Sequence, residues 1–354
     1  MATTHRIDNS SVNVTCCLQP VYGDLLTIVH ILFLVVFSIA GIVGNILVIT
    51  AVITTPRLHI IANLFVVNLS VTDFCVCGFF EPMYMYTLYY NTWPHVDTWC
   101  QIIGFFTIAT FGVSITTLST IAINRYVLIT RPPGTYRKVF SRRNNYIWVG
   151  WTWVFSIVWT LLPVMGFGKL GFNSAIGYCA YIYGDELTWW FLCSVLAFAV
   201  LPCVVMMFIG YFLTFRAIRL SRQRVQAVAQ NGIQANNTSN STEGTTTNKN
   251  DGKWSNTELK VTRQLFFIFA VFCVCWIPYC FANLSDRYLI VPKEAHRTFA
   301  ALAWFNSSLN PYLYAWMNRN FRSAYKRLLC CKKLNQSSKE TEQRTAGSTG
   351  TDPV

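Results

Sequence analysis

The stretch TLSTIAINRYVLITRP, residues 117–132, ends a long uncharged segment with an arginine. No charged side chain occurs between Thr98 and Asn124, whereas Arg125 is followed by five more basic residues up to Arg143. An uncharged run of this length can cross the hydrocarbon of a bilayer, which takes roughly 20 residues in a helix. The run therefore predicts a membrane-spanning helix, and Arg125 marks its end in place of an ordinary loop residue.

Composition extends this interpretation to the whole chain. Hydrophobic residues make up 53% of it and charged residues only 12%. A soluble domain carries about 25% charged residues, so the composition argues against a soluble globule. No apolar core occurs in residues 1–23, so we expect no cleaved signal peptide. We predict an all-α bundle of seven transmembrane helices, at residues 25–53, 61–90, 98–129, 145–168, 187–215, 262–285 and 297–317.

Basic residues set the expected orientation, because Lys and Arg near the ends of spans stay on the cytoplasmic side. With the N-terminus outside, 22 of the 28 basic residues fall on the cytoplasmic side and five on the outer side. We therefore predict a multi-pass plasma-membrane protein with an extracellular N-terminus and a cytoplasmic C-terminus. The net charge of +13 reflects this topology and would attract anionic membrane lipids. Nucleic acid is not an expected partner, because no soluble basic domain would bind it.

The segments outside the spans have compositions of their own. The extracellular tail, 1–24, carries candidate glycosylation sites at Asn9 and Asn13. A third cytoplasmic loop at about 221–257 and a tail at 332–354 are polar, so we expect both to be disordered. Residues 318–331 predict a short basic amphipathic helix on the inner leaflet. It ends in Cys330 and Cys331, which are either palmitoylation sites or free thiols.

Polar residues inside the spans are costly and are functional candidates by default. Asp73 is accompanied by mid-depth polar residues on other spans, namely Asn45, Ser114, Asn306, Ser307 and Asn310. If these converge, their oxygens could bind a small hard cation such as sodium. The alternative is a polar network that holds helices together. No protease, hydrolase or P-loop motif occurs, so we do not expect an enzyme or an organic cofactor.

One pair of cysteines is placed for a disulfide. Cys100 opens the third expected span on its outer side, and Cys179 lies in the outer loop between spans four and five. Because the outer face of a cell membrane is oxidising, a bond between them would tie that loop over the bundle.

Each span carries a short motif, and the motifs follow the order of one known family. They are GIVGN ending at Asn45, NLSVTD ending at Asp73, Cys100, NRY at 124–126, Trp153, Pro163, Cys179, Pro202, CWIP at 275–278, NPYLY at 310–314 and NRNFR at 318–322. Over residues 25–331 the chain resembles a rhodopsin-like (class A) G-protein-coupled receptor. The resemblance implies a receptor for a small molecule that acts on a heterotrimeric G protein, for which we favour the inhibitory class. Arrestin and receptor kinases are further partners implied by the family.

The resemblance also implies an activation switch near the cytoplasmic face. Arg125 would pair with Glu258 and hold spans three and six together in the resting state. The family usually has an acid where this chain has Asn124, so we expect a weaker latch and raised basal activity. The family tyrosine of span five is displaced by one place, to Tyr211. The remaining switch residues are Tyr126, Trp276, Pro278, Asn310, Pro311 and Tyr314.

The ligand pocket implied by the family is aromatic. Its candidate residues are Thr107, Phe111, Trp276, Asn283, Phe299, Ala303 and Trp304, with Glu81, Tyr84 and Trp189 near the rim. Thr107 stands where amine receptors have an aspartate, and Trp304 where opsins have the retinal-binding lysine, so both receptor classes are disfavoured. A pocket so poor in charge suits an apolar or indole-like ligand, and helix packing is the alternative role for each aromatic. A fatty acid would need a cation, for which Lys169, Arg287 and Arg297 are candidates.

The NRY triplet and LLPVMGFGKLGFNSAIGYC, residues 161–179, look most like one branch of the family. That branch holds the melatonin receptors, the medium-chain fatty-acid receptor and the insect trapped-in-endoderm and moody receptors. Asn310–Pro311 departs from the melatonin group, which usually has Asn-Ala there.

Two other classes of function stay open on the sequence. An ion-coupled transporter or channel would use Asp73 and Glu81 along its path, but we find none of the inverted repeats typical of transporters. A non-signalling adhesion or scaffold protein would fit Asn124 and the final residues TDPV, which weakly resemble a PDZ-binding terminus.

Overall fold

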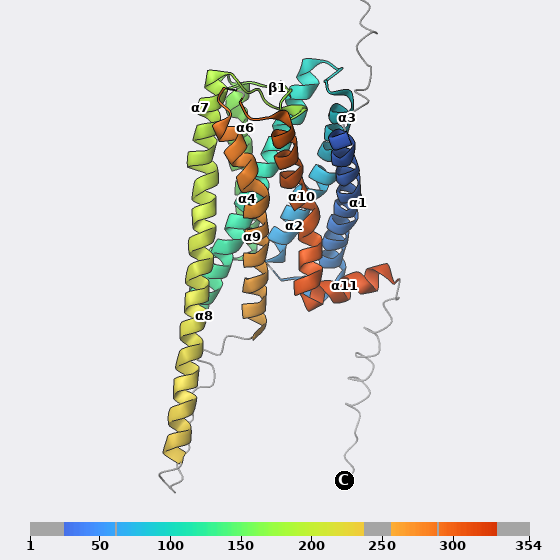
Figure 1. The fold of residues 1–354 in the computed structure, drawn as a ribbon. Coiled ribbons are helices and arrows are strands. Elements are labelled where there is room, and N and C mark those ends of the chain that lie inside the picture. Colours follow the sequence, from blue (N-terminus) through green and yellow to red (C-terminus); the bar gives the residue numbers. More distant parts are fainter. Residues whose placement is uncertain (1–24, 61, 237–255, 289, 331–354) are drawn as a thin grey trace, which may run out of the picture.

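The computed structural model describes residues 25–60, 62–236, 256–288 and 290–330, with side chains described at all of these except 222, 224–236 and 256–259. The described chain forms a bundle of seven long helical rods (Figure 1), as the sequence predicts. The rods are α1 (Leu25–Thr54), α2 (Asn63–Cys75) continued by α3 (Glu81–Tyr90), α4 (Asp97–Thr130), α6 (Arg142–Val164), α7 (Glu186–Val195) continued by α8 (Leu201–Asn236), α9 (Asn256–Ser285) and α10 (Lys293–Met317).

Six of the rods are long and apolar enough to cross a membrane, whereas α10 falls below that level of apolarity. The reason is visible in its burial pattern. Its polar side chains Asn306, Ser307, Ser308 and Asn310 are buried inside the bundle, where they face other helices. Intramembrane polar residues usually face a bundle interior, so the polar face of α10 is consistent with the seventh span.

Two rods are interrupted by wide π-turns that the sequence did not predict. Val76–Phe80 links α2 to α3, and Leu196–Val200 links α7 to α8. Each turn is followed within two residues by a proline, Pro82 and Pro202. Proline has no backbone N–H to donate, and in membrane helices a local π-turn can satisfy the backbone groups that this leaves free. By contrast, Pro163, Pro278 and Pro311 lie inside continuous helices.

The connections at the end of the bundle opposite the α6–α7 loop hold more helix than expected. The α8 helix continues to Asn236, so residues 221–236 of the loop expected to be disordered are helical. This stretch is rich in Arg, Gln and Ala and contains no proline, and these residues favour helix. Residues 237–255 lie outside the described part. Two short elements also occur here, the 3-10 turn η2 (Pro56–Leu58) and α5 (Pro133–Val139).

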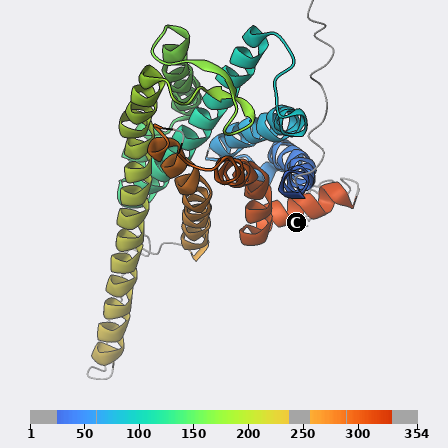
Figure 2. The ribbon, with the colours of Figure 1, turned by 45° about the horizontal axis from the view of Figure 1, so that its top comes forward.

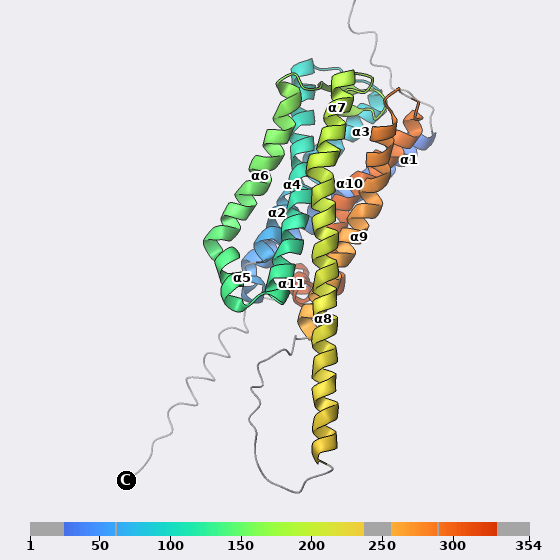
Figure 3. The same ribbon diagram turned by 90° about the vertical axis from the view of Figure 1, so that its left-hand side faces the viewer.

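The α4 helix is the central rod of the bundle. It packs against α2, α6 and α8 and also against two short strands that follow α6, β1 (Leu170–Asn173) and β2 (Tyr178–Tyr181) (Figure 3). The α9 helix packs mainly on α10, and α1 packs on α2 and α10. Because α8 holds chiefly to α4 and α9 chiefly to α10, the α8–α9 seam is comparatively open on its outward side.

A short helix, α11 (Arg319–Leu329), lies across the end of α10 (Figure 1). The Asn318 side chain caps it by accepting a hydrogen bond from Asn320 N at 2.9 Å. Phe321 stacks on Tyr314 with ring centroids 5.4 Å apart, and the Tyr325 hydroxyl donates to Pro311 O at 3.3 Å. The buried rings fix α11 against the bundle and leave Arg319, Arg322 and Lys326 exposed, as expected of an amphipathic helix, whereas Arg327 donates to the buried Thr55.

Candidate functional site

The loop between α6 and α7 forms a two-stranded antiparallel hairpin, β1 (Leu170–Asn173) and β2 (Tyr178–Tyr181). Figure 2 shows the hairpin crossing over one end of the bundle. The turn is closed by Gly177, whose φ of 79° suits glycine, and by the Asn173 side chain, whose Oδ1 accepts from Ala175 N at 2.9 Å. The hairpin was not predicted from the sequence, which gave no strand in this loop.

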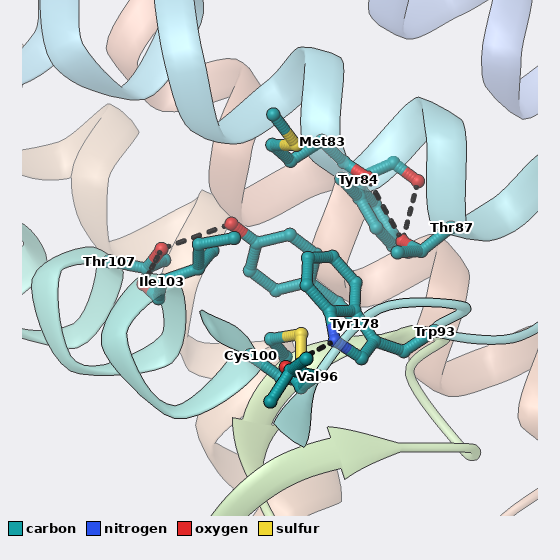
Figure 4. Close-up of a disulfide and its surroundings, with 10 residues drawn as sticks. Met83, Tyr84, Thr87, Trp93, Val96, Cys100, Ile103, Thr107 and Tyr178 are labelled. Carbon is teal, nitrogen blue, oxygen red and sulfur yellow. Dashed lines mark hydrogen bonds between the residues drawn. A yellow bond between two sulfur atoms is a disulfide. The ribbon is translucent and has the colours of Figure 1, made fainter. Parts of the chain in front are cut away.

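A disulfide between Cys100 and Cys179 joins the hairpin to the start of α4, as expected (Figure 4). Gly104 lies one turn further along α4. A side-chain carbon there would sit 3.2 Å from the carbonyl oxygen of Cys179, so glycine lets the helix and the hairpin come close. The bond and the small residue together hold β2 against the bundle core.

This arrangement places Tyr178 inside the helical bundle. Its ring is 2% exposed and lies between Thr107 and Tyr84 (Figure 4). Its hydroxyl makes a 3.0 Å hydrogen bond with the Thr107 hydroxyl. Burial raises the pKa of the Tyr178 phenol, so it acts as a neutral hydrogen-bonding group. Sequence reasoning missed Tyr178, although its position directly before the disulfide cysteine was the available signal.

Tyr178 belongs to a continuous set of ring contacts, which we call the aromatic cluster: Tyr84, Phe111, Tyr178, Trp276 and Trp304. Trp304 stacks on Tyr84 with centroids 5.5 Å apart and meets Tyr178 edge-on at 5.1 Å. Phe111 contacts Trp304 at 5.5 Å and Trp276 at 4.7 Å, both edge-on. The cluster therefore connects the hairpin to Trp276. Trp276 also stacks on Phe272, one helical turn earlier in α9, with ring centroids 5.8 Å apart.

The predicted pocket residues divide into two groups. Thr107, Phe111, Trp276, Ala303 and Trp304 lie in or beside the aromatic cluster, and Tyr84, placed at the rim, is a central member of it.

The others lie elsewhere. Asn283 accepts a hydrogen bond from the Tyr183 hydroxyl, and Trp189 donates to Leu284 O at 3.2 Å, so both belong to a rim site between α7 and α9. Phe299 is half-buried and makes none of the described ring contacts with the cluster. Arg287 lies 4.6 Å over the Trp189 ring at the same rim, while the Arg297 guanidinium donates to Asn91 at 2.7 Å.

Glu81 is fully buried at the start of α3, two helical turns beyond Asp73. The Cys77 thiol lies 4.0 Å from one of its oxygens, and the other oxygen has no partner among the described residues. Burying a carboxyl group without partners is costly. Glu81 therefore remains a candidate functional residue beneath the aromatic cluster, one turn before Tyr84.

A polar centre surrounds Asp73 deeper in the bundle. Asn310 donates to Asp73 Oδ2 at 2.8 Å, and Ser307 lies beside the same carboxyl group. Asn45 donates to Gly41 O at 2.9 Å and to Ser307 O at 3.2 Å, which ties α1 to α10. The Ser114 hydroxyl makes a 3.1 Å hydrogen bond with the hydroxyl of Thr72, the residue that precedes Asp73 in the sequence.

Buried oxygens of Asp73 and of the three asparagines predicted to accompany it have no hydrogen-bond partner among the described residues: Asp73 Oδ1, Asn45 Oδ1, Asn306 Oδ1 and Asn310 Oδ1. Buried polar oxygens are normally satisfied. Carboxylate and amide oxygens are also the ligands that hard cations prefer. The donor set therefore fits the sodium ion that the sequence suggested.

The C-terminal end of α4 carries the expected switch triplet, Asn124, Arg125 and Tyr126. Asn124 is 1% exposed and its amide donates to the Tyr136 hydroxyl of α5 at 3.4 Å. Arg125 is partly buried beside Tyr211, and Tyr126 lies under the Arg131 guanidinium at 6.0 Å. Glu258 falls in the first turn of α9, but its side chain lies outside the described residues, so its pairing with Arg125 stays a prediction.

Tyr211 faces the bundle interior despite its displaced position. It is 2% exposed and stacks on Phe269 of α9 with centroids 5.9 Å apart. The preceding Gly210 packs against the backbone of Ala122, where a side-chain carbon would lie 3.5 Å from its carbonyl oxygen. Gly210 thus brings α8 close to α4, and Tyr211 is directed between α4 and α9 near Arg125.

Comparison with known proteins identifies the class. The model of the seven-transmembrane receptor (rhodopsin) family matches residues 44–314. The human 5-hydroxytryptamine receptor 4 is 27% identical over 88% of this chain and 81% of its own. The chicken melatonin receptor type 1C is 28% identical over 84% of this chain and 80% of its own length. The fold is that of squid rhodopsin, with a TM-score of 0.72 at 22% identity over 94% of both chains.

The chain belongs to the rhodopsin family of seven-transmembrane receptors. It is accordingly a multi-pass protein of the plasma membrane and a receptor that acts through G proteins, with a small-molecule ligand. Members of this family are not generally enzymes. Its relatives include both an amine receptor and a melatonin receptor.

Proposed function

We propose that the protein binds an apolar or indole-like small molecule on its extracellular side and activates the inhibitory class of G protein. The aromatic cluster carries this proposal. Its rings line the centre of the bundle under the hairpin, and Thr107 offers a neutral hydroxyl where an ammonium group would need a carboxylate. 5-Hydroxytryptamine and melatonin, the ligands named for two relatives, are both indoles. An indole would stack on these rings and could replace the Tyr178 contacts.

The cluster also supplies a route from ligand to G protein. A molecule that displaces Trp304 or Phe111 changes the contacts of Trp276, which sits two residues before Pro278 in α9. A ligand can shift a resting equilibrium only through such differential contacts. On the inner side, Arg125 and Tyr211 lie where α4, α8 and α9 meet, so movement of α9 would alter their surroundings.

Replacing Arg125 by alanine is expected to abolish G-protein activation, because the guanidinium is the charged group at the inner junction of α4. Nucleotide exchange would be measured on a panel of purified G proteins with membranes carrying the wild-type chain or Arg125→Ala. Exchange would be recorded without ligand and then with indoles and medium-chain fatty acids. Arg142→Ala, an exposed arginine at the start of α6, is the control and should behave like the wild type. If no G protein responded to the wild type, the receptor proposal would fail and ion flux would be tested next.

The Asn124→Asp variant is expected to lower basal nucleotide exchange. An aspartate in this buried position would accept from the Tyr136 hydroxyl and pair with the neighbouring Arg125, which an amide cannot neutralise. Hydrogen bonds to charged groups add about 1.5–3 kcal/mol, so the active fraction should fall at least about tenfold. Exchange without ligand measures this fraction, and Asn124→Gln is the uncharged control. Unchanged basal exchange in Asn124→Asp would remove the weakened latch from the proposal.

We also propose that Asp73, Asn310, Asn306 and Ser114 bind an allosteric sodium ion, with Asn45 and Ser307 alongside. Sodium chloride should then stabilise the purified protein against heat more than potassium chloride at equal ionic strength. The expected gain is about 1.4 kcal/mol when sodium stands at ten times its Kd. Asp73→Asn should remove this difference between the salts. An equal sodium effect in both proteins would instead assign it to ordinary salt screening.

The remaining assignments follow the orientation predicted by the basic residues, with the N-terminus outside and the C-terminus inside. Cys330 is exposed at the end of α11, where an acyl chain would reach the bilayer beside the apolar Leu329. We propose Cys330 and Cys331 as palmitoylation sites and Asn9 and Asn13 as glycosylation sites. Arrestin, receptor kinases and a PDZ protein at the C-terminus are proposed partners. Asn9, Asn13, Cys331 and the C-terminus lie outside the described residues.

A further inference from the structure

The open seam between α8 and α9 contains a groove on the outer surface of the bundle. It is lined by Val204, Val205 and Phe208 of α8 and by Phe266, Phe269, Ala270 and Cys273 of α9. The volume is about 450 Å3, within the range of sites that hold small molecules. Phe208 is 62% exposed and Phe266 38% exposed, so the groove opens outward rather than into the receptor core. Every lining side chain is apolar, which excludes a charged group as its occupant.

The groove continues into a basic end. On α8, Phe208, Phe212, Arg216 and Arg219 follow one another at helical spacing along one face, and both arginines are exposed. On α9, Arg263 precedes Phe266 by three residues and is also exposed. Residues three or four apart share a helix face. The apolar groove and the three arginines therefore form one strip along the α8–α9 seam.

The length of the strip matches one leaflet of a bilayer. Ten residues separate Arg263 from Cys273, which is roughly 15 Å of helix at 1.5 Å per residue. The hydrocarbon core of a bilayer is about 30 Å thick, so one leaflet contributes about 15 Å. An acyl chain lying in the groove would thus carry its headgroup to the level of the arginines.

We propose that this strip binds an anionic phospholipid of the cytoplasmic leaflet, with one acyl chain in the groove and its phosphate on Arg216, Arg219 and Arg263. The arginine guanidinium can donate two parallel hydrogen bonds to one phosphate group, and its positive charge is attracted to anionic leaflets. The acyl chain contacts Phe266 and Phe269. Both rings abut Tyr211, with centroids 5.9 Å away in each case. Bound lipid therefore supports the α8–α9 seam next to the switch region, at a site separate from the aromatic cluster.

The test compares phosphatidylserine with phosphatidylcholine of identical dioleoyl chains, bound to the purified full-length protein and counted by native mass spectrometry. The combined variant Arg216→Gln/Arg219→Gln/Arg263→Gln should weaken phosphatidylserine binding about a hundredfold. Lys138→Gln/Arg142→Gln/Arg143→Gln removes the same charge from the α5–α6 end of the molecule and should leave binding unchanged. Equal binding of the two lipids to the wild type, or equal loss in both triple variants, would overturn the proposal.

The groove itself is tested by filling it. Ala270→Trp should prevent binding of phosphatidylserine, because the new ring occupies the acyl-chain site. Gly150→Trp on α6 is the matched control, since a side chain there meets nothing within 4 Å. Undiminished lipid binding to Ala270→Trp would place the lipid elsewhere. Displacement of phosphatidylserine by cholesterol at equal concentration would assign the groove to a sterol and overturn the proposed occupant.

A measurement on the unaltered chain avoids any variant that folds poorly. Cys273 lines the groove and is partly buried, so bound lipid should slow its alkylation by N-ethylmaleimide. Cys193 on α7, partly buried and outside the groove, is the internal reference in the same peptide analysis. Slower alkylation of Cys273 relative to Cys193 with phosphatidylserine supports the site, and an unchanged ratio contradicts it. Both readouts report lipid occupancy, so they do not depend on G-protein activation.

Discussion

Removing the Cys100–Cys179 disulfide, by the double variant Cys100→Ala/Cys179→Ala, is expected to lower the free energy of unfolding by about 2–5 kcal/mol. The bond closes a loop with a sequence separation of 79 residues, so its loss frees a long segment of the unfolded chain. The folded state also loses the anchor of β2. Tyr178 precedes Cys179 directly, so its place between Thr107 and Tyr84 becomes less fixed.

Thermal unfolding of the purified protein, followed by a dye that fluoresces on reaction with thiols, measures this effect. Cys77, Cys203 and Cys275 are buried and react only when the bundle opens. The control is Cys75→Ala, which removes a free, partly buried cysteine from α2 and should change the unfolding temperature little. Ligand affinity should fall with stability in the double variant alone. An unaltered unfolding temperature would mean that the hairpin is held by its other contacts, chiefly those of Tyr178.

The fold was predictable because the spans are recognisable from the apolar character of their own residues. Uncharged runs such as the one ending at Arg125 are long enough to cross a bilayer as a helix, and the runs are separated by charged or polar segments. The same local signal fails for the π-turns at Val76–Phe80 and Leu196–Val200, because both segments are as apolar as the α-helical turns around them, so hydropathy does not distinguish the two kinds of turn. Only the prolines that follow hint at them.

Part of the aromatic cluster was predicted from positions that the family motifs define on α4, α9 and α10. Thr107, Phe111, Trp276 and Trp304 were assigned to a common pocket by family position, and the structure brings them together. Tyr178 was missed because its burial depends on how a loop folds back over the bundle, which helical spacing cannot reveal. Phe299 and Asn283 point to different surroundings although both were assigned to the same pocket, because small rotations of α9 and α10 decide which side chains face inward.

A second contact beyond the reach of sequence patterns joins α9 to α10 on the hairpin side of the bundle. Asp286 follows the last turn of α9, and His296 lies in the first turn of α10. The His296 ring donates from Nε2 to Asp286 Oδ2 at 2.7 Å, and Val291 N donates to Asp286 Oδ1 at 2.9 Å. The Asp286 side chain is 1% exposed and the His296 side chain 0%. The Tyr183 ring lies 5.2 Å from the His296 ring, so the pair also supports the end of the hairpin.

The His296→Ala variant is expected to destabilise the protein by about 3–5 kcal/mol, because it leaves the buried Asp286 carboxyl without its main partner. Thermal unfolding with the same thiol dye measures the loss. Replacing both residues, as Asp286→Leu/His296→Leu, should recover much of the stability, since no polar group is then left unpaired. The Lys169→Met variant breaks the exposed Lys169–Asp185 pair, 2.7 Å long, and serves as the control with little expected effect. If the double variant were as unstable as His296→Ala, the loss would come from packing around the ring. The His296–Asp286 hydrogen bond would then contribute little to the stability with which α9, α10 and the hairpin are held together above the aromatic cluster.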